Sequence, residues 1–495
     1  MTPHAEVPST TAAHTSERAD VLTQKDEGRE RVTESDKPGS GQTKDHRSHL
    51  RSTPLDELHD LICIGFGPAS LAIAIALHDA LDAADSSGGL SQLRGRRPKV
   101  AFLERQPSFA WHSGMLLPGA KMQITFIKDL ATLRDPRSEF TFLNYLHKQD
   151  RLVQFTNLST FLPQRLEYED YMRWCAGKFA EVVTYGQDVF DIAPNRSPAA
   201  EETVDMFTVK SRDMSTGQII ERRTKRVVVA IGGKPQIPQP LPEKHARVIH
   251  SAAYANTIPK LFPDTQSYRN FVVVGSGQSA AEVFHDLQCQ YPNSTTRLVI
   301  KGSALRPSDD SPFVNEIFDP DRIDGFFNQS QTLRHDSIME DRCTNYGVVR
   351  LELLEEIYAG LYTQRLKYPS QEQWPHRILN HSFVSGWKEK PDGSLLVHLQ
   401  HERDQGQVCN GTKSENVLEA DAVIVAVGYR RDGHEEMLKS SRYLLPNQDH
   451  TNSKFEVERD YKIKFREGAV ADDTGIWLQG CNESTHGVSS KQGDT

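Results

Sequence analysis

Cysteine is scarce in this sequence, and its six cysteines form no redox or metal motif. No two of them stand in a Cys-x-x-Cys pair or at a similarly close spacing: they are Cys63, Cys175, Cys289, Cys343, Cys409 and Cys481. A disulfide reductase needs a dithiol, and a zinc site needs Cys and His ligands at short spacings. The sequence therefore argues against both, and we predict no metal site. Cys63 stands in an apolar run and is predicted to be a small core residue.

Long apolar runs and an excess of positive charge are also missing. The longest apolar run, Leu71 to Leu77, is far too short to span a bilayer, so no membrane partner is expected. The net charge of −9 gives no reason to expect nucleic-acid binding. Residues 1–50 are polar and are predicted to be disordered. They resemble neither a signal peptide nor a transit peptide, so the expected location is cytoplasmic.

Two glycine-rich turns about two hundred residues apart are the main motif of the chain. Gly65-Phe66-Gly67-Pro68-Ala69-Ser70 follows one apolar run, and Gly275-Ser276-Gly277-Gln278-Ser279-Ala280 follows another. Each pattern predicts a strand, a tight turn that can approach a pyrophosphate, and a helix whose N-terminal amides face the anion. Two such units predict two dinucleotides in one protein and electron transfer between them.

The residue that ends the next strand indicates which nucleotide each turn binds. After the first turn this residue is Glu104, a hydrogen-bond acceptor for ribose hydroxyls. After the second turn it is Lys301, which would attract a 2′-phosphate and favour NADP. A solvated surface lysine is the alternative, and the residues leave it open. The polar stretch 85–98 is interpreted as a surface insertion.

The order of the apolar segments predicts an α/β fold with two Rossmann-like domains, the second inserted in the first. We expect the first domain to begin at 56–235 and the second to occupy 236–414, with a smaller helical region at about 306–375. The run 227–233 is predicted to be a buried strand, and 348–361 an amphipathic helix. The late run 421–429 is predicted to return the chain to the first domain, which would include 415–495.

Four further stretches carry a family resemblance that covers about 60–489. They are residues 60–77, 111–137, 306–318 and 482–487. With them the chain resembles the flavin-dependent N-hydroxylating monooxygenases, in particular the branch that acts on L-ornithine in fungal siderophore biosynthesis. The resemblance implies FAD at the first turn and NADPH at the second. NADPH would reduce FAD, reduced FAD and O₂ would form a C4a-hydroperoxide, and this would convert the ornithine side-chain amine to N5-hydroxyornithine. No side chain would then be catalytic, and a homotetramer is implied.

The same resemblance assigns binding roles by position. FAD would be held by Gly65, Gly67, Ser70, Glu104 at the adenosine ribose, Trp111, His112, Met115 and Gln123 around the isoalloxazine, the backbone of Val189 at the adenine, and His486, Gly487 and Val488. NADP would be held by Gly275, Ser276, Gly277, Gln278, Ser279, Lys301, Asn345, Tyr346 and Gly347. Ornithine would contact Lys121 through its carboxylate, and also Asn315, Glu316, Ile317, Phe318, Asn345 and Ser489.

Other readings stay open at this point. Lysine differs from ornithine by one methylene, which a pocket discriminates by only about 1–3 kcal/mol. An NADPH oxidase of the same two-domain type and a non-catalytic flavin-binding protein are the alternatives from other classes. In the family an aliphatic helix follows the segment that matches 485–487, whereas here the polar residues 490–495 follow. We therefore expect weaker FAD retention than in a chain that carries the helix.

Overall fold

The computed structural model describes residues 48–87, 97–196, 203–401, 417–446 and 454–487. Leu50 is buried with 1% of its surface exposed, and the Ser48 amide donates to the Lys178 carbonyl over 3.1 Å. Residues 48–50 thus belong to the fold and not to the predicted disordered segment, because Leu50 has a hydrophobic core to enter. The rest of that segment lies outside the described residues.

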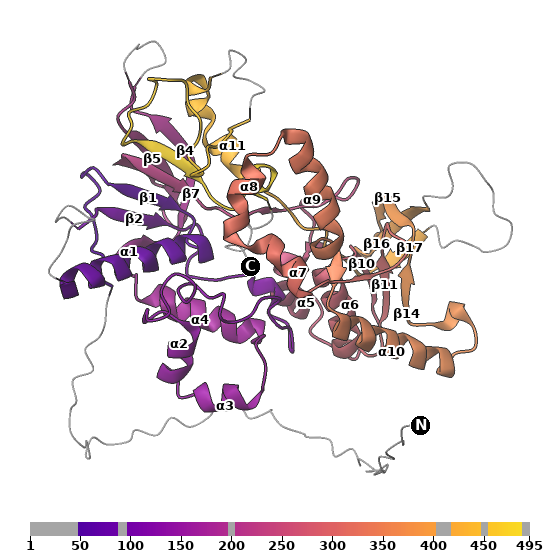
Figure 1. The fold of residues 1–495 in the computed structure, drawn as a ribbon. Coiled ribbons are helices and arrows are strands. Elements are labelled where there is room, and N and C mark those ends of the chain that lie inside the picture. The colour runs from indigo at the N-terminus through magenta and orange to yellow at the C-terminus, as the bar shows by residue number, and fades with distance from the viewer. Residues whose placement is uncertain (1–47, 88–96, 197–202, 402–416, 447–453, 488–495) are drawn as a thin grey trace, which may run out of the picture. The chain divides into compact units, whose positions relative to one another are not determined.

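The first nucleotide domain is built on a five-stranded parallel sheet of order β20-β7-β1-β2-β3, of which β1, β2 and β7 are labelled in Figure 1. Its strands are β1 (Leu61–Ile64), β2 (Val100–Leu103), β3 (Val183–Thr184), β7 (Arg226–Val229) and β20 (Gly475–Leu478). Helix α1 (Pro68–Ser87) follows β1 directly, as predicted. It continues into the stretch interpreted as an insertion, so that interpretation began too early; residues 88–96 lie outside the described part.

Two smaller layers complete this domain. An antiparallel sheet consists of β4 (Gln187–Pro194), β5 (Phe207–Asp213) and β6 (Ile219–Thr224). Three helices, α2 (Phe142–Lys148), α3 (Leu152–Asn157) and α4 (Arg165–Gly177), surround an aromatic core. Aromatic side chains bury large apolar areas, so this cluster is a major source of stability.

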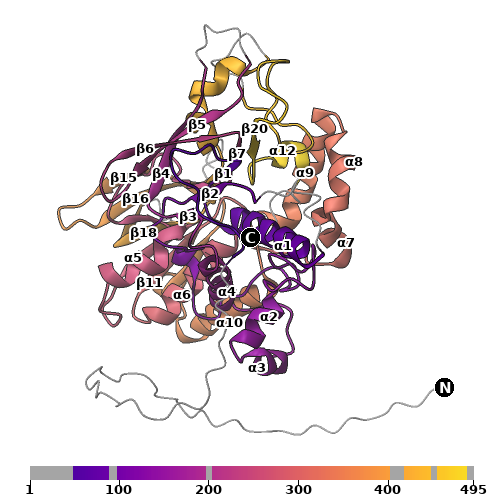
Figure 2. The ribbon, with the colours of Figure 1, turned by 90° about the vertical axis from the view of Figure 1, so that its left-hand side faces the viewer.

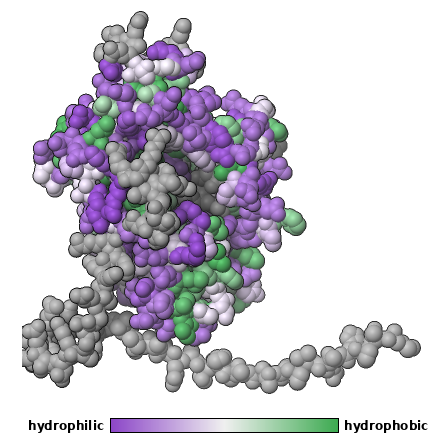
Figure 3. Space-filling model, turned by 60° about the vertical axis from the view of Figure 1, so that its left-hand side comes forward, coloured by the Kyte–Doolittle hydropathy of each residue, from purple (hydrophilic) through white to green (hydrophobic). Residues whose placement is uncertain are grey.

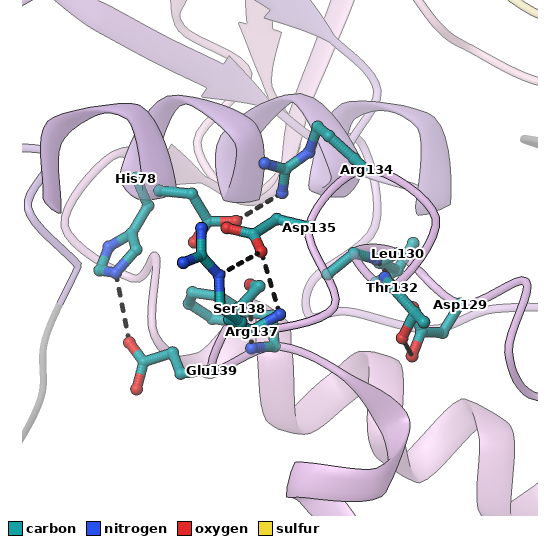
Figure 4. A network of polar contacts seen from close by, with 12 residues as sticks. His78, Asp129, Leu130, Thr132, Arg134, Asp135, Arg137, Ser138 and Glu139 are labelled. Atoms are coloured by element: carbon teal, nitrogen blue, oxygen red, sulfur yellow. Dashed lines mark hydrogen bonds and ion pairs between the residues drawn. The ribbon is translucent and has the colours of Figure 1, made fainter. Parts of the chain in front are cut away.

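A polar loop ties these helices to α1 (Figure 4). Arg134 pairs with Asp79 of α1, and His78 of α1 lies 3.2 Å from the Glu139 carboxylate. The Asp129 carboxylate accepts hydrogen bonds from the amides of Thr132 and Phe142, at 2.6 and 2.7 Å. Arg134, near the end of the stretch 111–137, thus helps to hold this loop against α1.

The second nucleotide domain has its own parallel sheet, of order β14-β11-β10-β18-β9. Its strands are β9 (Val248–His250), β10 (Asn270–Val274), β11 (Thr295–Val299), β14 (His376–Leu379) and β18 (Ala422–Val425). Helix α6 (Gln278–Gln290) follows β10, and α5 (Tyr254–Leu261) follows β9. Three antiparallel strands follow β14 or precede β18 in the chain: β15 (Ser382–Glu389), β16 (Leu395–His401) and β17 (Val417–Ala420). Their buried side chains form one hydrophobic cluster with those of the parallel sheet.

The predicted return strand was assigned to the wrong sheet. β18 pairs with β10 and β9 of the second sheet, whereas β20 pairs with β7 and returns the chain to the first sheet (Figure 2). The predicted insertion of one domain in the other is thus correct, but its end lies after β18 and not at residue 415. A strand buried on both faces has the same apolar pattern in either sheet, so the pattern alone could not choose.

The helical region lies where it was predicted, with one boundary changed. It contains α7 (Pro312–Asn315), η3 (Glu316–Phe318), η4 (Pro320–Arg322), α8 (Ile323–Phe327), α9 (Gln331–Asn345) and α10 (Leu351–Lys367). Val348 and Val349, predicted to open the last helix, instead form β13 and pair with β12 (Arg306–Pro307). Two adjacent β-branched residues favour this extended conformation.

Short elements complete the chain. They are η1 (Ser113–Met115), β8 (Lys234–Pro235), η2 (Ser251–Ala253), η5 (Gln371–Gln373), β19 (Tyr429–Arg430), α11 (Gly433–Met437), η7 (Lys439–Leu444) and α12 (Glu483–His486). Helix α12 packs against α8 and α9 (Figure 2). Within the described ranges, no helix combines the length and apolarity needed to cross a bilayer.

Candidate functional site: two nucleotide turns and the seam between them

The first glycine turn combines a close backbone approach with an open space. Gly65 has a φ of +87°, and a Cβ built there would lie 2.3 Å from the Ala230 carbonyl oxygen at the end of β7. A Cβ built on Gly67 would meet no atom within 4 Å. Glycine is therefore required at 65 by the fold, whereas at 67 it leaves a concave cradle at the start of α1. Such a cradle fits a pyrophosphate.

Glu104 fixes the shape of this turn. Its carboxylate accepts hydrogen bonds from the amides of Phe66, at 2.7 Å, and Gln106, at 2.8 Å. Its side chain is largely buried at the carboxyl end of β2. The acid that was predicted to bind the ribose therefore also holds the glycine turn, and it stands beside the cavity described next.

A cavity of about 750 Å³ extends along the carboxyl ends of β1, β2 and β7. This is the edge at which parallel sheets bind dinucleotides, and the volume suits a ligand of that size. Of the residues predicted to bind FAD, the cavity is lined by Gly65, Gly67, Glu104, Trp111, His112 and Val189. Val189 precedes a register shift between β4 and β5, which bends the strand at this wall.

Sequence reasoning missed part of this lining. Gly232, Gly233, Tyr429, Arg431 and Met437 also line the cavity. The two glycines end the buried strand run 227–233 and could have been found from that position. The other three come from segments near β19 and α11, which no local motif connects with the cavity. Ser70, predicted to bind FAD, is fully buried at the start of α1 and is not among the lining residues.

The turn 111–115 joins this cavity, which is predicted to hold FAD and is called the flavin cavity below, to the second domain. Trp111 and His112 line the cavity, whereas Met115 is buried in the core of the second domain. A Cβ on Gly114 would lie 2.0 Å from the Ala252 carbonyl oxygen, so η1 packs directly on η2. The His112 ring lies 6.2 Å from Tyr429, which in turn lies 5.0 Å from His250. Gln123, predicted near the isoalloxazine, is exposed.

The second glycine turn repeats the first at its leading glycine and differs at the next one. Gly275 has a φ of +140°, and its Cβ would lie 2.3 Å from the Ala426 carbonyl oxygen, just after β18. A Cβ on Gly277 would lie 3.3 Å from the Gly347 Cα, and one on Gly347 would lie 3.4 Å from the Ser276 Oγ. The structure thus brings together two segments that were predicted separately to bind NADP.

The remaining NADP residues lie around this turn. Gln278 and Ser279 begin α6, and Lys301 is exposed shortly after β11. The Gln278 side chain contacts Glu282 and the Arg350 amide, each at 2.9 Å. Tyr346 pairs with Glu483 of α12 through its hydroxyl, and burial raises its pKa. Asn345 ends α9; its side chain lies outside the described part.

Most of the predicted substrate residues stand on two segments, the loop of Lys121 and the segment 315–318. Lys121 is exposed and forms a β-bridge with Gln164. A backbone hydrogen bond chiefly lowers the pKa of Glu352 in the first turn of α10, and the charges of Arg350 and Lys121 lower it further. The Lys128 ammonium lies 6.0 Å from the ring of Phe318. Lys128, seven residues after Lys121, is thus the described contact between this stretch of the first domain and Phe318.

Asn315 and its neighbours are accessible. The Asn315 side-chain amide donates to the Asp310 carbonyl over 2.9 Å, and Asn315 and Glu316 are exposed. Ile317 and Phe318 are half-buried. Ser489 and Val488 lie outside the described residues. The same short segment thus carries two exposed polar residues followed by two half-buried apolar ones.

The late segment 482–487 is packed tightly. His486 is fully buried, its ring stacks on Tyr461 at 4.0 Å, and burial lowers its pKa. Gly487 has a φ of +74°, and a Cβ there would lie 3.4 Å from the ring of Phe326. Neither residue lines the described flavin cavity. The proposed contacts of this segment with the flavin ring remain a prediction.

Two cysteines lie in the core of the first domain, and for Cys63 this was predicted. Cys63 and Cys175 are fully buried, and burial raises the pKa of both thiols. A protonated thiol is a poor nucleophile, so burial of this kind is typical of structural cysteines. Within the described part of the chain, no group of three or more His, Cys, Asp and Glu side chains is arranged to hold a metal ion.

Two parallel sheets, each with a glycine turn at its carboxyl edge, define an α/β protein with two dinucleotide-binding domains. The family model described as L-lysine 6-monooxygenase/L-ornithine 5-monooxygenase matches residues 57–431. The L-ornithine N(5)-monooxygenase of Cochliobolus heterostrophus is 55% identical over 454 residues, which cover 90% of this chain and 85% of that protein. The chain belongs to this monooxygenase family.

Solved structures agree with the fold. The ornithine hydroxylase of Pseudomonas aeruginosa superimposes with a TM-score of 0.75 at 33% identity, covering 88% of this chain and 98% of that one. The ornithine N-hydroxylase of Kutzneria sp. 744, solved with reduced FAD, NADP⁺ and L-orn, gives 0.75 at 30% identity, covering 89% and 96%. The predicted fold class is therefore confirmed.

Proposed function

We propose that the protein hydroxylates the side-chain amine of L-ornithine, as the first step of hydroxamate siderophore biosynthesis. The amine, O₂, NADPH and a proton would give N5-hydroxyornithine, NADP⁺ and water. One observation carries the proposal: a single segment, 111–121, lines the flavin cavity, enters the core of the second domain and ends at the exposed cation of Lys121. It thus links the flavin cavity with the second domain and with Lys121, which we propose binds the substrate carboxylate.

FAD fits the first cavity and NADPH the second turn. The cradle at Gly67, the start of α1 and the Glu104 carboxylate would hold the pyrophosphate and adenosine of FAD. When bound, FAD supplies the redox chemistry with O₂ that side chains lack. The residues that line the cavity, among them Trp111 and Tyr429, would bind and orient the reactants and would have to limit access of water.

Ornithine would bind between the loop of Lys121 and the segment 315–318. Lys121 would pair with its carboxylate, while Asn315, Asn345 and Ser489 would contact its polar atoms. Glu316, Ile317 and Phe318 would complete the pocket. The amine must react through its lone pair, although a lysine-like amine has a pKa of about 10.4 in water. We therefore expect hydroxylamine formation in a single turnover to rise from neutral to alkaline pH; a flat profile would contradict this.

One assay separates this function from its alternatives. NADPH consumption is measured with and without ornithine, against the hydroxylamine and hydrogen peroxide formed. Hydroxylamine in proportion to NADPH supports the proposal, peroxide alone indicates an NADPH oxidase, and no consumption indicates a flavin-binding protein. Replacing ornithine by lysine tests the rival substrate, because a higher kcat/KM for lysine would reassign the enzyme.

The role of Lys121 is tested by Lys121→Ala. Loss of a charge-assisted hydrogen bond costs about 1.5–3 kcal/mol, so we expect the Kd for ornithine to rise about ten- to a hundredfold, with unchanged FAD content. Lys148→Ala, at the exposed end of α2, is the matched control and keeps the Kd of the unaltered protein. An unchanged Kd in Lys121→Ala would remove Lys121 from the site.

The proposal extends to the assembly and the location of the protein. Apolar side chains are exposed on α2–α4 and nearby, among them Val153, Leu158, Phe161 and Leu166, and on α10, among them Tyr358, Tyr362 and Leu366. Figure 3 shows apolar areas of this kind among polar ones on one face. Large exposed apolar patches are typical of interfaces. We expect a homotetramer in the cytoplasm, and light scattering after gel filtration measures its mass.

A further inference from the structure

A buried ion pair joins the two nucleotide domains. Arg165 begins α4 of the first domain, and Glu282 lies on α6 of the second. Both nitrogens at the end of the guanidinium donate to the carboxylate, Nη1 to Oε2 and Nη2 to Oε1, each over 2.9 Å. The side chains are 12% and 7% exposed. This two-point contact fixes the orientation of both groups as well as their distance.

On the flavin side, Arg165 holds both ends of one segment. Its Nη1 also donates to the Met115 carbonyl over 2.7 Å, and its backbone amide donates to the Ala120 carbonyl over 2.8 Å. The preceding residue, Gln164, is bridged to Lys121. The position of Lys121 relative to the turn 111–115, called the flavin turn below, therefore depends on Arg165.

On the NADP side, the contacts continue from Glu282. Its Oε1 accepts a hydrogen bond from the Gln278 side chain over 2.9 Å, and the Gln278 Oε1 accepts one from the Arg350 amide over 2.9 Å. Gln278 belongs to the second glycine turn, and Arg350 stands three residues after Gly347. One chain of polar contacts thus runs from the Met115 carbonyl through Arg165 and Glu282 to Gln278 in the second glycine turn, and ends at the Arg350 amide just after the segment 345–347.

We propose that Arg165 and Glu282 are positioning residues that couple NADP binding to ornithine binding. This inference rests on the proposed function. A buried ion pair often contributes little net stability compared with apolar residues of similar volume. Its distinctive effect here is geometric, because it fixes the position of the second glycine turn relative to the loop that carries Lys121. Neither residue lines the flavin cavity, so their effect on ligands is indirect.

The test replaces the pair by apolar side chains of similar size, in the double variant Arg165→Met/Glu282→Leu. The Kd of NADP⁺ for the FAD-loaded protein is measured by titration calorimetry with and without saturating ornithine, and the ratio of the two is the coupling factor. We expect a factor of at least about five in the unaltered protein, the lower end of typical coupling, and about one in the double variant. Hydroxylamine formed per NADPH should fall severalfold.

The control is a pair on the same helix that does not cross domains, Arg173→Met/Glu169→Leu. It should retain the coupling factor. If the double variant does not fold, Arg165→Lys serves in its place, since lysine keeps the charge but cannot make the two-point contact. A coupling factor of one in the unaltered protein, or an unchanged factor in the variant, would overturn the inference. The proposed function is judged separately, by hydroxylamine formation in the unaltered protein.

Discussion

Gly65 and Gly67 stand two residues apart in one turn, yet the structure constrains them differently. Gly65 faces the backbone of Ala230 with a left-handed φ, whereas Gly67 faces open space. The motif predicted both as ligand-binding glycines and could not separate a residue that the fold requires from one that a ligand requires. Their difference comes from β7, which is remote in sequence.

This difference can be measured with alanine variants. Gly65→Ala should lower the free energy of unfolding by more than about 1 kcal/mol, since alanine disfavours positive φ and its Cβ meets a carbonyl. Gly67→Ala should leave apo-protein stability nearly unchanged but weaken FAD binding, because its methyl group fills the cradle. Urea unfolding of the apo-proteins and FAD titration give the two quantities. Equal stability loss in both variants would contradict this assignment.

Among the elements, the contact of η1 with η2 determines how the flavin turn meets the second domain. Trp111 and Gly114 belong to a stretch that was conspicuous in the sequence, but no local pattern indicated that its partner is Ala252. The strand patterns likewise predicted β18 and could not assign its sheet. Elements follow from local periodicity, whereas their partners follow from packing.

Gly114→Ala tests the contact of η1 with η2. Its Cβ would overlap the Ala252 carbonyl, and such overpacking typically costs 1–3 kcal/mol. We expect a loss of this size in urea unfolding and a changed flavin absorbance spectrum. Gly177→Ala is the control: it ends α4, and its Cβ would meet no atom within 4 Å, so stability should not fall. An unchanged spectrum in Gly114→Ala would show that η1 can move without affecting the flavin.

His376 makes the edge of the second sheet sensitive to acid. Burial, with a smaller effect of Arg297, lowers its pKa to about 4, and its Nδ1 lies 2.8 Å from the Thr296 hydroxyl. Between about pH 6.5 and 4 the unfolded chain binds a proton here that the native chain does not, so stability falls as pH falls through this window. Urea unfolding from pH 7 to 4 should reveal this loss, and His376→Gln should reduce it. An identical pH dependence in the variant would exclude His376 as its cause.

At the scale of the whole molecule, ligand binding adds to the stability of two domains that are joined by the Arg165–Glu282 ion pair. The flavin cavity is formed by residues from β1 to α11, so FAD contacts segments far apart in the chain. At a hundred times its Kd, free FAD should stabilise the protein by about 2.7 kcal/mol. Melting curves of the stripped protein with FAD, and with FMN as control, measure this. FMN lacks the adenosine that Glu104 and Val189 would hold, so an equal shift would contradict their assignment.

The glycine turns, the strands before them and the acid at 104 are local patterns, and from these the sequence alone determined the α/β class and the two nucleotide units. The family followed from the resemblance carried by residues 60–77, 111–137, 306–318 and 482–487. The binding roles assigned to single residues remain predictions. The end of the inserted domain, the wall formed by Tyr429, Arg431 and Met437, and the Arg165–Glu282 pair were decided by the tertiary structure. Each of these depends on contacts between distant segments, and periodicity within one segment carries no information about its partner.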